Sequence, residues 1–142
     1  MELDVKKLRS GAILPTRGSR LAAGYDLHAL DDARIFPGET VMIDTGVAVQ
    51  LAKGTFGAVY ARSGLSTKRG LGLANGVGVI DADYRGTIKV PLYNRGTESQ
   101  WIRKGERIAQ LVVSLCITED VEIVDELDQT ERGSGGFGST GR

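Results

Sequence analysis

Residues 71–86 read Leu-Gly-Leu-Ala-Asn-Gly-Val-Gly-Val-Ile-Asp-Ala-Asp-Tyr-Arg-Gly, and they carry the clearest structural signals in the chain. Apolar residues alternate with small ones on both sides of Asn75-Gly76, a dipeptide that favours a tight hairpin turn. The pattern predicts one strand that ends near Leu73 and a second that returns through Val79 and Ile80. The second strand runs directly into an acidic turn, which places a carboxylate where a buried element meets solvent.

Short strands separated by glycine turns continue on both sides of this stretch. Alternating apolar residues predict them at 41–43, 47–51, 56–60, 88–92, 108–113 and 121–124. Only a short turn after Ser63 has helical character. Many short strands at close spacing predict an all-β fold of the jelly-roll, sandwich or small-barrel type. Pro91 lies inside one of these strands, which predicts an edge strand or a bulge there.

The composition fits one compact domain of 142 residues, 41% of which are hydrophobic. The formal net charge is zero, so direct binding to nucleic acid is not expected. Between residues 60 and 110, however, nine Lys or Arg stand against four Asp or Glu. A basic middle of this kind suits a small polyanion such as a triphosphate, although an ordinary mixed surface explains it as well.

The single cysteine, Cys116, excludes an intrachain disulfide, and its apolar neighbours predict that it is buried in a strand. No apolar run approaches the roughly 18 residues of a membrane-spanning helix. Charged residues within the first eight do not fit a signal peptide. The protein is therefore expected to be soluble and cytoplasmic, with no membrane partner.

Arg62-Ser63-Gly64 follows a predicted strand and precedes the short helical turn. Ser63 is expected to cap that turn, whose free backbone N–H groups favour an anion. Gly64 lets a phosphate approach closely, and Arg62 adds a planar cation with several donors. Ordinary turn chemistry explains the triplet equally well when it is taken alone.

Asp81 and Tyr84 belong to the acidic turn that follows the predicted hairpin. A carboxylate such as that of Asp81 is suited to orient and deprotonate a water. The ring of Tyr84 offers a flat surface for a sugar or a base. Asp83 and Arg85 are candidates for a structural ion pair in the same turn, which leaves an acidic surface turn as the alternative to a site.

Residues 130–142 differ from the rest of the chain, with five glycines and one large apolar residue, Phe137. Such a segment has no core of its own, so it is expected to be a mobile arm, separate from a domain at 1–129. Gly138-Ser139-Thr140 is able to curl so that N–H and hydroxyl groups face phosphate oxygens. Phe137 has nothing local to pack against, so a planar partner is expected. A disordered tail without function is the alternative.

Taken in order, five segments of the chain resemble the five motifs of the trimeric dUTP pyrophosphatases, or dUTPases. The segments are residues 22–27, 62–65, 78–86, 107–111 and the glycine-rich tail. Each motif is modest alone, but five in register are specific. The resemblance implies a jelly-roll homotrimer whose three active sites each combine residues of all three subunits. His28 stands where relatives often have an aromatic residue, and it is expected to be structural.

The resemblance implies that base and sugar bind around the hairpin of one subunit. The substrate-binding residues there are implied to be Asn75, Val79, Ile80, Tyr84 and Lys89. Asn75 and the nearby backbone would read the uracil edge. Asp81 would hold the attacking water and the deoxyribose 3′-hydroxyl. Tyr84 would pack under the sugar and leave no room for a 2′-hydroxyl.

A second subunit is implied to bind the phosphates, and a third to close the site with its tail. The implied phosphate-binding residues are Arg62, Ser63, Gly64, Gln110, Arg132, Gly138, Ser139 and Thr140. Phe137 would stack on uracil. The implied reaction is attack of water on the α-phosphorus of dUTP, which gives dUMP and pyrophosphate and limits uracil incorporation into DNA. Mg²⁺ suits the triphosphate because it binds phosphate oxygens and keeps several waters, one of which Asp26 would hold.

Two other functions remain open. A dCTP deaminase shares this fold, but it needs an acid near the hairpin, and residues 71–80 contain neither Asp nor Glu. A non-catalytic trimer that binds nucleotides or a protein partner is the second alternative. The intact Asp81 and tail argue against that as the sole role, while a regulatory role beside catalysis stays open.

Overall fold

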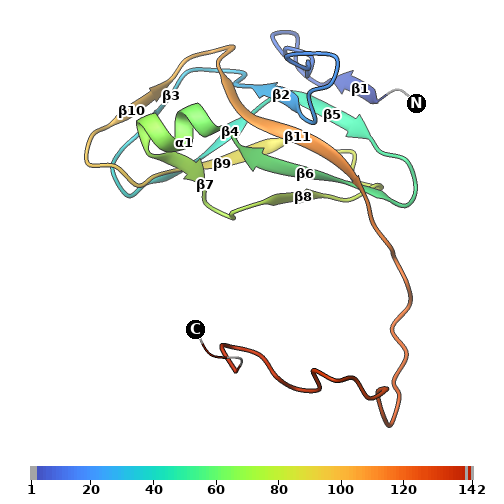
Figure 1. Ribbon diagram of the computed structural model, residues 1–142. Coiled ribbons are helices and arrows are strands. Elements are labelled where there is room, and N and C mark those ends of the chain that lie inside the picture. Colours follow the sequence, from blue (N-terminus) through green and yellow to red (C-terminus); the bar gives the residue numbers. More distant parts are fainter. Residues whose placement is uncertain (1–2, 140, 142) are drawn as a thin grey trace.

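The computed structural model describes residues 3–139 and residue 141, and its regular elements are antiparallel strands with one short helix (Figure 1). Its elements are β1 (Asp4–Lys7), β2 (Tyr25–His28), β3 (Ala33–Ile35), β4 (Thr40–Asp44), β5 (Val47–Gln50), β6 (Thr55–Ala61), α1 (Ser63–Arg69), β7 (Leu71–Leu73), β8 (Gly78–Ile80), β9 (Lys89–Asn94), β10 (Gln100–Ile102) and β11 (Arg107–Leu115). The expected all-β fold is confirmed. No helix in the described part of the chain is long and apolar enough to cross a membrane.

Two antiparallel sheets form the jelly-roll body. The larger sheet has the strand order β2-β11-β6-β8, and the other has the order β4-β9-β7. β11 spans 9 residues and pairs with β2 on one side and with β6 on the other. Two-stranded ladders, β1-β5 and β10-β3, complete the described fold. Four of the five segments that resemble family motifs, all but the tail, therefore lie on or beside the larger sheet.

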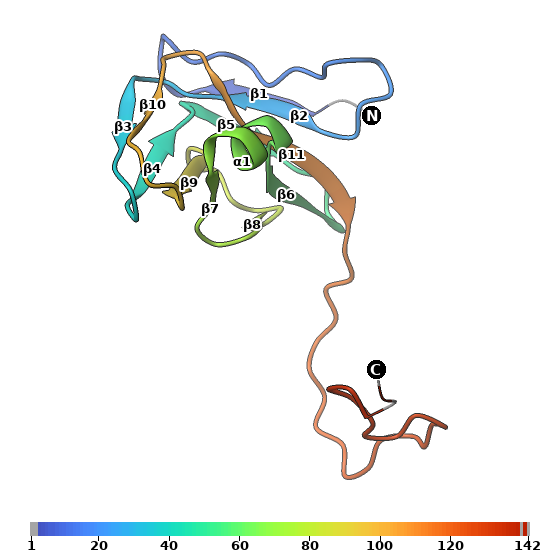
Figure 2. The same ribbon diagram turned by 60° about the vertical axis from the view of Figure 1, so that its left-hand side comes forward.

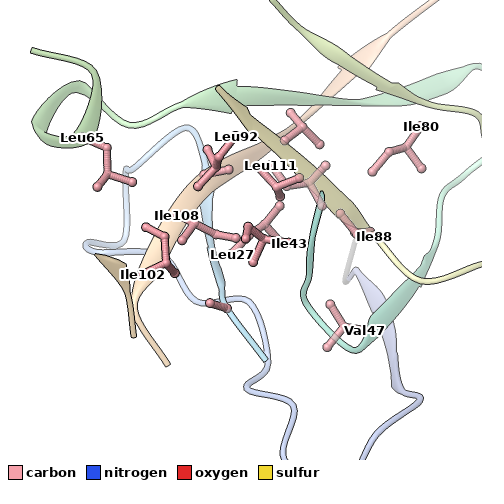
Figure 3. Packing of buried hydrophobic residues seen from close by; sticks show 14 of the residues in the cluster. Leu27, Ile43, Val47, Leu65, Ile80, Ile88, Leu92, Ile102, Ile108 and Leu111 are labelled. Atoms are coloured by element: carbon pink, nitrogen blue, oxygen red, sulfur yellow. The ribbon is translucent and has the colours of Figure 1, made fainter. Parts of the chain in front are cut away.

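The core is formed where the inward faces of these strands meet (Figure 3). Leu27, Ile108 and Leu111 come from the larger sheet, and Val90 and Leu92 come from the other; each is at most 1% exposed. Along β9 the buried and less buried residues alternate, as expected for a strand with one face in the core. Truncation of one such leucine to alanine is expected to cost about 2–5 kcal/mol of folding free energy.

The turn at Asn75-Gly76 forms, but the predicted hairpin does not. Gly76 has a φ of 73°, and its N–H donates to the carbonyl of Leu73 (3.1 Å). The flanking strands have different partners, since β7 pairs with β9 and β8 pairs with β6. The turn therefore carries the chain from one sheet to the other, because each short strand finds a longer partner in a different sheet.

The prediction that Pro91 marks an edge strand is wrong. β9 is the central strand of its sheet, and Pro91 lies opposite Met42 of β4. On the other side, the carbonyl of Pro91 accepts a bond from Ala74 N (2.9 Å), just beyond the last residue of β7. In a strand, the N–H and the carbonyl of one residue point to the same neighbouring strand. The N–H that proline lacks would therefore point toward Ala74, beyond the last residue of β7, and no bond of the β7–β9 pairing is lost.

The predicted strand at residues 121–124 is wrong. The last described strand ends at Leu115, and the chain then runs away from the body, as two views show (Figures 1 and 2). Val121 and Ile123 are 95% and 96% exposed, because nothing in a single chain packs against them. Cys116 follows β11 and is half-buried, so it is not the buried strand residue that was expected. The boundary expected between residues 129 and 130 stays a prediction, since the structure shows only that the last described strand ends at Leu115.

Candidate active site

A hollow of about 290 Å³ opens beside β8, and we call it the Asp81 hollow. β8 ends at Ile80, which is buried, whereas the next residue is exposed, so the carboxylate appears where the chain leaves the sheet. The predicted residues of base and sugar recognition line this one hollow: Asn75, Val79, Ile80, Asp81, Tyr84 and Lys89. The structure therefore brings together residues that the sequence spreads over a turn, a strand and the start of another strand.

Tyr84 forms one wall of the Asp81 hollow. Its N–H donates to the carbonyl of Asp81 (3.1 Å), and its hydroxyl donates to the carbonyl of Thr87 (3.0 Å). The ring lies against Gly86, where an added Cβ would come within 2.9 Å of Tyr84 Cε2. A glycine is therefore required at residue 86 if the ring is to keep this position.

Arg85 closes the same turn from outside. Its Nη1 donates to the carbonyls of Ala82 (2.7 Å) and Tyr84 (3.1 Å). The candidate ion pair between Arg85 and Asp83 is not among the salt bridges of the described residues. The guanidinium thus fixes the backbone of the turn and not a neighbouring carboxylate.

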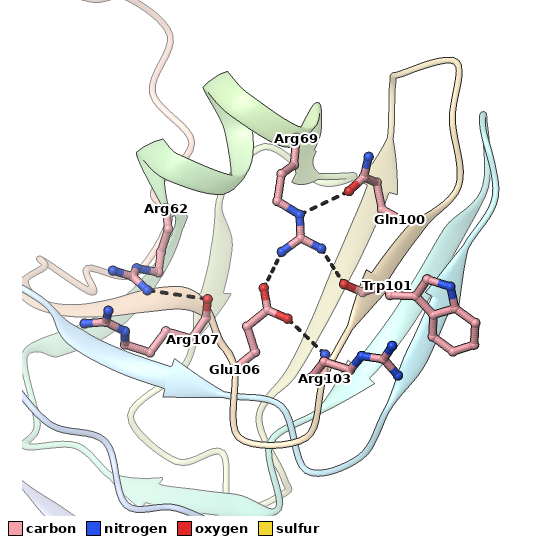
Figure 4. A network of polar contacts seen from close by, with 7 residues as sticks. All are labelled: Arg62, Arg69, Gln100, Trp101, Arg103, Glu106 and Arg107. Carbon is pink, nitrogen blue, oxygen red and sulfur yellow. Dashed lines mark hydrogen bonds and ion pairs between the residues drawn. The ribbon is translucent and has the colours of Figure 1, made fainter.

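A second hollow of about 280 Å³ lies at the start of α1, and we call it the Arg62 hollow. It is lined by two arginines, one acid and two small or apolar residues: Arg62, Arg107, Glu106, Gly64 and Leu65. Both arginines face Asp26, with Arg62 Nε 3.4 Å from Oδ1 and Arg107 Nη1 3.5 Å from Oδ2. Arg62 Nη1 also donates to the carbonyl of Arg107 at 3.5 Å (Figure 4). Two cations are thereby held side by side, in a place suited to an anion.

Gln110 lies next to this cluster, because the pairing of β2 with β11 sets it opposite Asp26. Its Nε2 donates to the carbonyl of Ala61 (3.3 Å), the residue before Arg62. A Cβ on Gly24 would lie 2.8 Å from Gln110 Oε1, so that position must be glycine if the amide is to stay in place. The predicted phosphate-binding residues of the body are therefore neighbours in space.

Ser63 does not cap α1 as expected. Arg62 is the residue that precedes the first helical turn, and no side chain caps it. Ser63 is the first helical residue, exposed together with Gly64, and a Cβ on Gly64 would meet nothing within 4 Å. The segment is thus open to solvent on the side where a ligand would approach.

Residues 130–139 of the tail lie away from the body of their own chain (Figures 1 and 2). Arg132 Nε donates to the carbonyl of Gly135 (2.8 Å), so the guanidinium closes a turn of the tail itself. Phe137 is fully exposed and has a φ of 52°, a strained value for a residue with a side chain. Gly138 and Ser139 form turns that follow it, and Thr140 lies outside the described residues.

Two functional candidates were missed by sequence reasoning. Arg107 begins the fourth motif, but only its register opposite His28 shows that it reaches Asp26. Thr87 lines the Asp81 hollow, and its hydroxyl donates to Asp44 Oδ1 (2.6 Å). Both residues are recognised only by their contacts with residues that are far away in the sequence, so no local sequence pattern identifies either of them.

His28 occupies the end of β2 beside the arginine cluster. Burial lowers the pKa of His28 below its ordinary value. The negative charge of Asp26 raises this pKa, and the positive charges of Arg107 and Arg62 lower it further. Its Nδ1 is buried without a hydrogen-bond partner among the described residues. A half-buried, neutral imidazole agrees with the structural role expected for this residue.

The described residues contain no group of three or more His, Cys, Asp or Glu side chains placed to hold a metal ion. Asp26 is the expected contact for Mg²⁺, and each of its oxygens already faces one arginine. Its side chain is 16% exposed. Such a carboxylate fits a contact to a metal-bound water better than direct coordination of the ion.

Comparison with known proteins agrees with this geometry. A dUTPase family model matches residues 10–141. The deoxyuridine 5′-triphosphate nucleotidohydrolase of Corynebacterium glutamicum is 51% identical over 141 residues, which cover 99% of this chain and 95% of the relative. The likeness therefore extends over the body and the tail together.

Solved structures share the fold. A mutant dUTPase of Staphylococcus bacteriophage 80alpha with dUpNHpp has a TM-score of 0.93 at 32% identity, and the match covers 99% of both chains. A mutant dUTPase of phage phi11 of S. aureus, which coordinates a structural Mg(II) ion, has a TM-score of 0.85 at 26% identity over 91% of this chain and 100% of the other. By sequence along nearly its whole length and by fold, the chain belongs to the dUTPase family.

Proposed function

We propose that this enzyme hydrolyses dUTP to dUMP and pyrophosphate in a composite site, formed by the Asp81 hollow of one subunit and the Arg62 hollow of another. One observation carries the proposal. The residues predicted for base and sugar line one hollow, whereas Arg62 and Gly64, predicted for the phosphates, line the other, and the two hollows share no lining residue. A second subunit that sets its Arg62 hollow against the Asp81 hollow would complete the site.

In this proposal the Asp81 hollow selects the nucleoside. Asn75 and the backbone around Val79 and Ile80 read the uracil edge, and Tyr84 packs under the deoxyribose. The exposed carboxylate of Asp81 orients the attacking water and takes its proton. Lys89, exposed on the rim, adds a positive charge toward the triphosphate.

The Arg62 hollow would hold the phosphates. Arg62 and Ser63 face the oxygens, Gly64 leaves room for them, and the amide of Gln110 adds a donor. Arg107, through its pairing with Asp26, joins the cationic wall. Attack on so anionic a centre requires its charge to be neutralised, and fixed guanidinium groups provide this without reorganisation during the reaction.

Mg²⁺ is the metal that we propose for the reaction, held mainly by the substrate phosphates. When bound, it would neutralise part of the triphosphate charge. Asp26 would hold one of its waters, which agrees with a carboxylate that is partly exposed and flanked by cations. The structural Mg(II) ion of the phage phi11 relative supports magnesium in this family.

The tail, residues 130–142, would come from a third subunit of a homotrimer. Arg132 and Gly138 to Thr140 would cover the γ-phosphate, and Phe137 would stack on uracil. The distance of the tail from both hollows of its own chain supports a site on a neighbour (Figure 1). An arm that orders over the substrate would also exclude water from the phosphates.

The test is pyrophosphate release with Mg²⁺ from dUTP, dCTP, dTTP and UTP at equal concentrations. Strong release from dUTP alone is expected, whereas deamination of dCTP would favour the rival enzyme. For the composite site, inactive Asp81→Asn chains and tail-truncated chains are mixed, unfolded and refolded together. Activity should return in the mixture only, because a site there can combine an intact Asp81 with another chain's tail. A mixture that stays inactive would contradict the sharing of sites between subunits.

A further inference from the structure

Helix α1 follows Arg62 directly, but little within the helix fixes its position. It has seven residues, only Leu65 is buried, and no side chain caps its start. A helix this short is not stable by itself in water, so contacts with the rest of the protein must set its place. Leu65 packs in the core, Arg95 Nη2 donates to Ser66 Oγ (3.2 Å), and further contacts lie at the two ends of the helix.

Arg69, the last residue of α1, makes the contacts at one end (Figure 4). Its Nε donates to Gln100 Oε1 (3.1 Å), Nη1 binds Glu106 Oε1, and Nη2 donates to the carbonyl of Trp101. Three nitrogens of one guanidinium thus bind three separate acceptors. The planar, forked geometry of arginine suits this arrangement, and a lysine has only one nitrogen to offer.

Glu106 connects this end of the helix to the phosphate-binding cluster. Its Oε2 accepts a bond from Arg103 N (2.9 Å), which closes the turn between β10 and β11. The next residue is Arg107, whose carbonyl accepts from Arg62 Nη1 and whose side chain pairs with Asp26. Both ends of α1 are therefore fastened to the same short stretch of chain, at Glu106 and at Arg107.

We propose that Arg69 and Glu106 are a positioning pair that sets the geometry of the phosphate-binding residues. Glu106 itself lines the Arg62 hollow, where its ion pair with Arg69 offsets its charge. The proposal rests on the assignment of the triphosphate to the Arg62 hollow. If the pair is broken, α1 keeps its core contact at Leu65 and the bond from Arg95 to Ser66, but it loses its link to the stretch that carries Arg107, so Arg62 to Gly64 shift relative to Arg107. The Asp81 hollow has no lining residue in this network, so nucleoside binding stays unchanged.

The test compares two ligands of the full-length enzyme, dUMP and a non-hydrolysable imido analogue of dUTP, by calorimetry. Arg69→Met is expected to raise the Kd of the analogue and the KM for dUTP by about 10- to 100-fold, which corresponds to about 1.4–2.8 kcal/mol of binding free energy. The Kd of dUMP should stay within about twofold if only positioning is lost. Glu106→Ala should have the same effect, and the double variant should be no worse than either single one.

Two further variants separate positioning from general damage. Arg103→Met is the matched control, because its guanidinium stacks on Trp101 at 4.9 Å and makes no described bond to α1. It should bind both ligands like the wild type. Arg69→Lys keeps the charge but not the forked guanidinium, so the Kd of the analogue should rise less than in Arg69→Met and the Kd of dUMP should not rise. This variant keeps the test possible if Arg69→Met does not fold.

An unchanged Kd for the analogue in both Arg69 variants would overturn the positioning role. An equal rise for dUMP and for the analogue would also overturn it, since that outcome indicates general loss of structure. Failure of the wild-type enzyme to release pyrophosphate from dUTP would instead overturn the proposed site. The two failures are therefore distinguishable.

Discussion

Arg62 and Asp26 form an ion pair in which Nε lies 3.4 Å from Oδ1, at the point where β2 faces the start of α1. The second oxygen of Asp26 faces Arg107 at 3.5 Å. One carboxylate thus holds two guanidinium groups that would otherwise repel each other. This arrangement explains how a chain of zero net charge presents a local cationic wall.

Asp26→Asn should weaken the phosphate end of the site. The amide keeps the shape but loses the charge that holds both arginines, so KM for dUTP is expected to rise on the order of 10-fold. If Asp26 also holds a metal-bound water, the Mg²⁺ concentration for half-maximal rate will rise as well. A magnesium titration at saturating dUTP measures this, and an unchanged midpoint would remove Asp26 from the metal.

Asp81→Asn should abolish most turnover and leave binding intact. An amide cannot take a proton from water, so kcat should fall at least ~100-fold, the scale of a lost general base. The Kd of a non-hydrolysable dUTP analogue should change little. Asp83→Asn is the matched control, because it removes an exposed carboxylate from the same turn. If both variants turn over at similar rates, Asp81 is not the base.

Tyr84→Ala should narrow the preference for dUTP over UTP, because the ring that fills the space near the sugar is lost. Gly86→Ala should act in the same direction, since its methyl group would displace the ring. Tyr84→Phe keeps the ring and loses only the bond to Thr87, so the preference should be retained. The ratio of kcat/KM for the two nucleotides is the measurement. An unaltered ratio in Tyr84→Ala would mean that the sugar is read elsewhere.

Strand positions are predictable from the sequence, because alternation of apolar residues is a local signal. β9 and β11 lie where residues 88–92 and 108–113 predict them. Strand partners are less predictable. The turn at Asn75-Gly76 indicates a hairpin, yet its flanking strands join different sheets, because pairing depends on how the whole core packs.

The same limit applies to the site. Asp81 and Tyr84 are recognisable because their motif is continuous in the sequence, and they do share a hollow. The contact of Arg107 with Asp26 depends on the register between β2 and β11, which no local pattern encodes. The prediction of a strand at residues 121–124 was wrong for a related reason, because no strand of the described chain pairs with this segment.

Asp44 should make the folded state sensitive to acid. Burial raises the pKa of Asp44, but hydrogen bonds from Thr87 and from Gly46 N, together with the positive charges of Lys89 and Arg9, outweigh it, so the pKa lies below its ordinary value. A lowered pKa in the folded state contributes stability above the unfolded value of about 4, and that stability is lost as the pH falls through the folded value. Urea unfolding at pH 6 and pH 3 should show a smaller drop for Asp44→Asn than for the wild type. An identical drop would exclude this contribution.

Deletion of residues 132–142 should leave a folded protein with little activity. The described part of the tail runs away from the body of its own chain, so the deletion should leave the midpoint of thermal unfolding unchanged (Figure 2). Pyrophosphate release should nevertheless collapse, because the γ-phosphate and the base lose their cover. Phe137→Ala should lower kcat/KM by less than the deletion does. If the ring stacks on uracil equally in the ground state and in the transition state, KM should rise and kcat should stay unchanged. A chain shortened by residue 142 alone is the control and should be fully active. A truncated enzyme with an unchanged rate would show that the tail has no part in catalysis, however closely its sequence resembles that of its relatives.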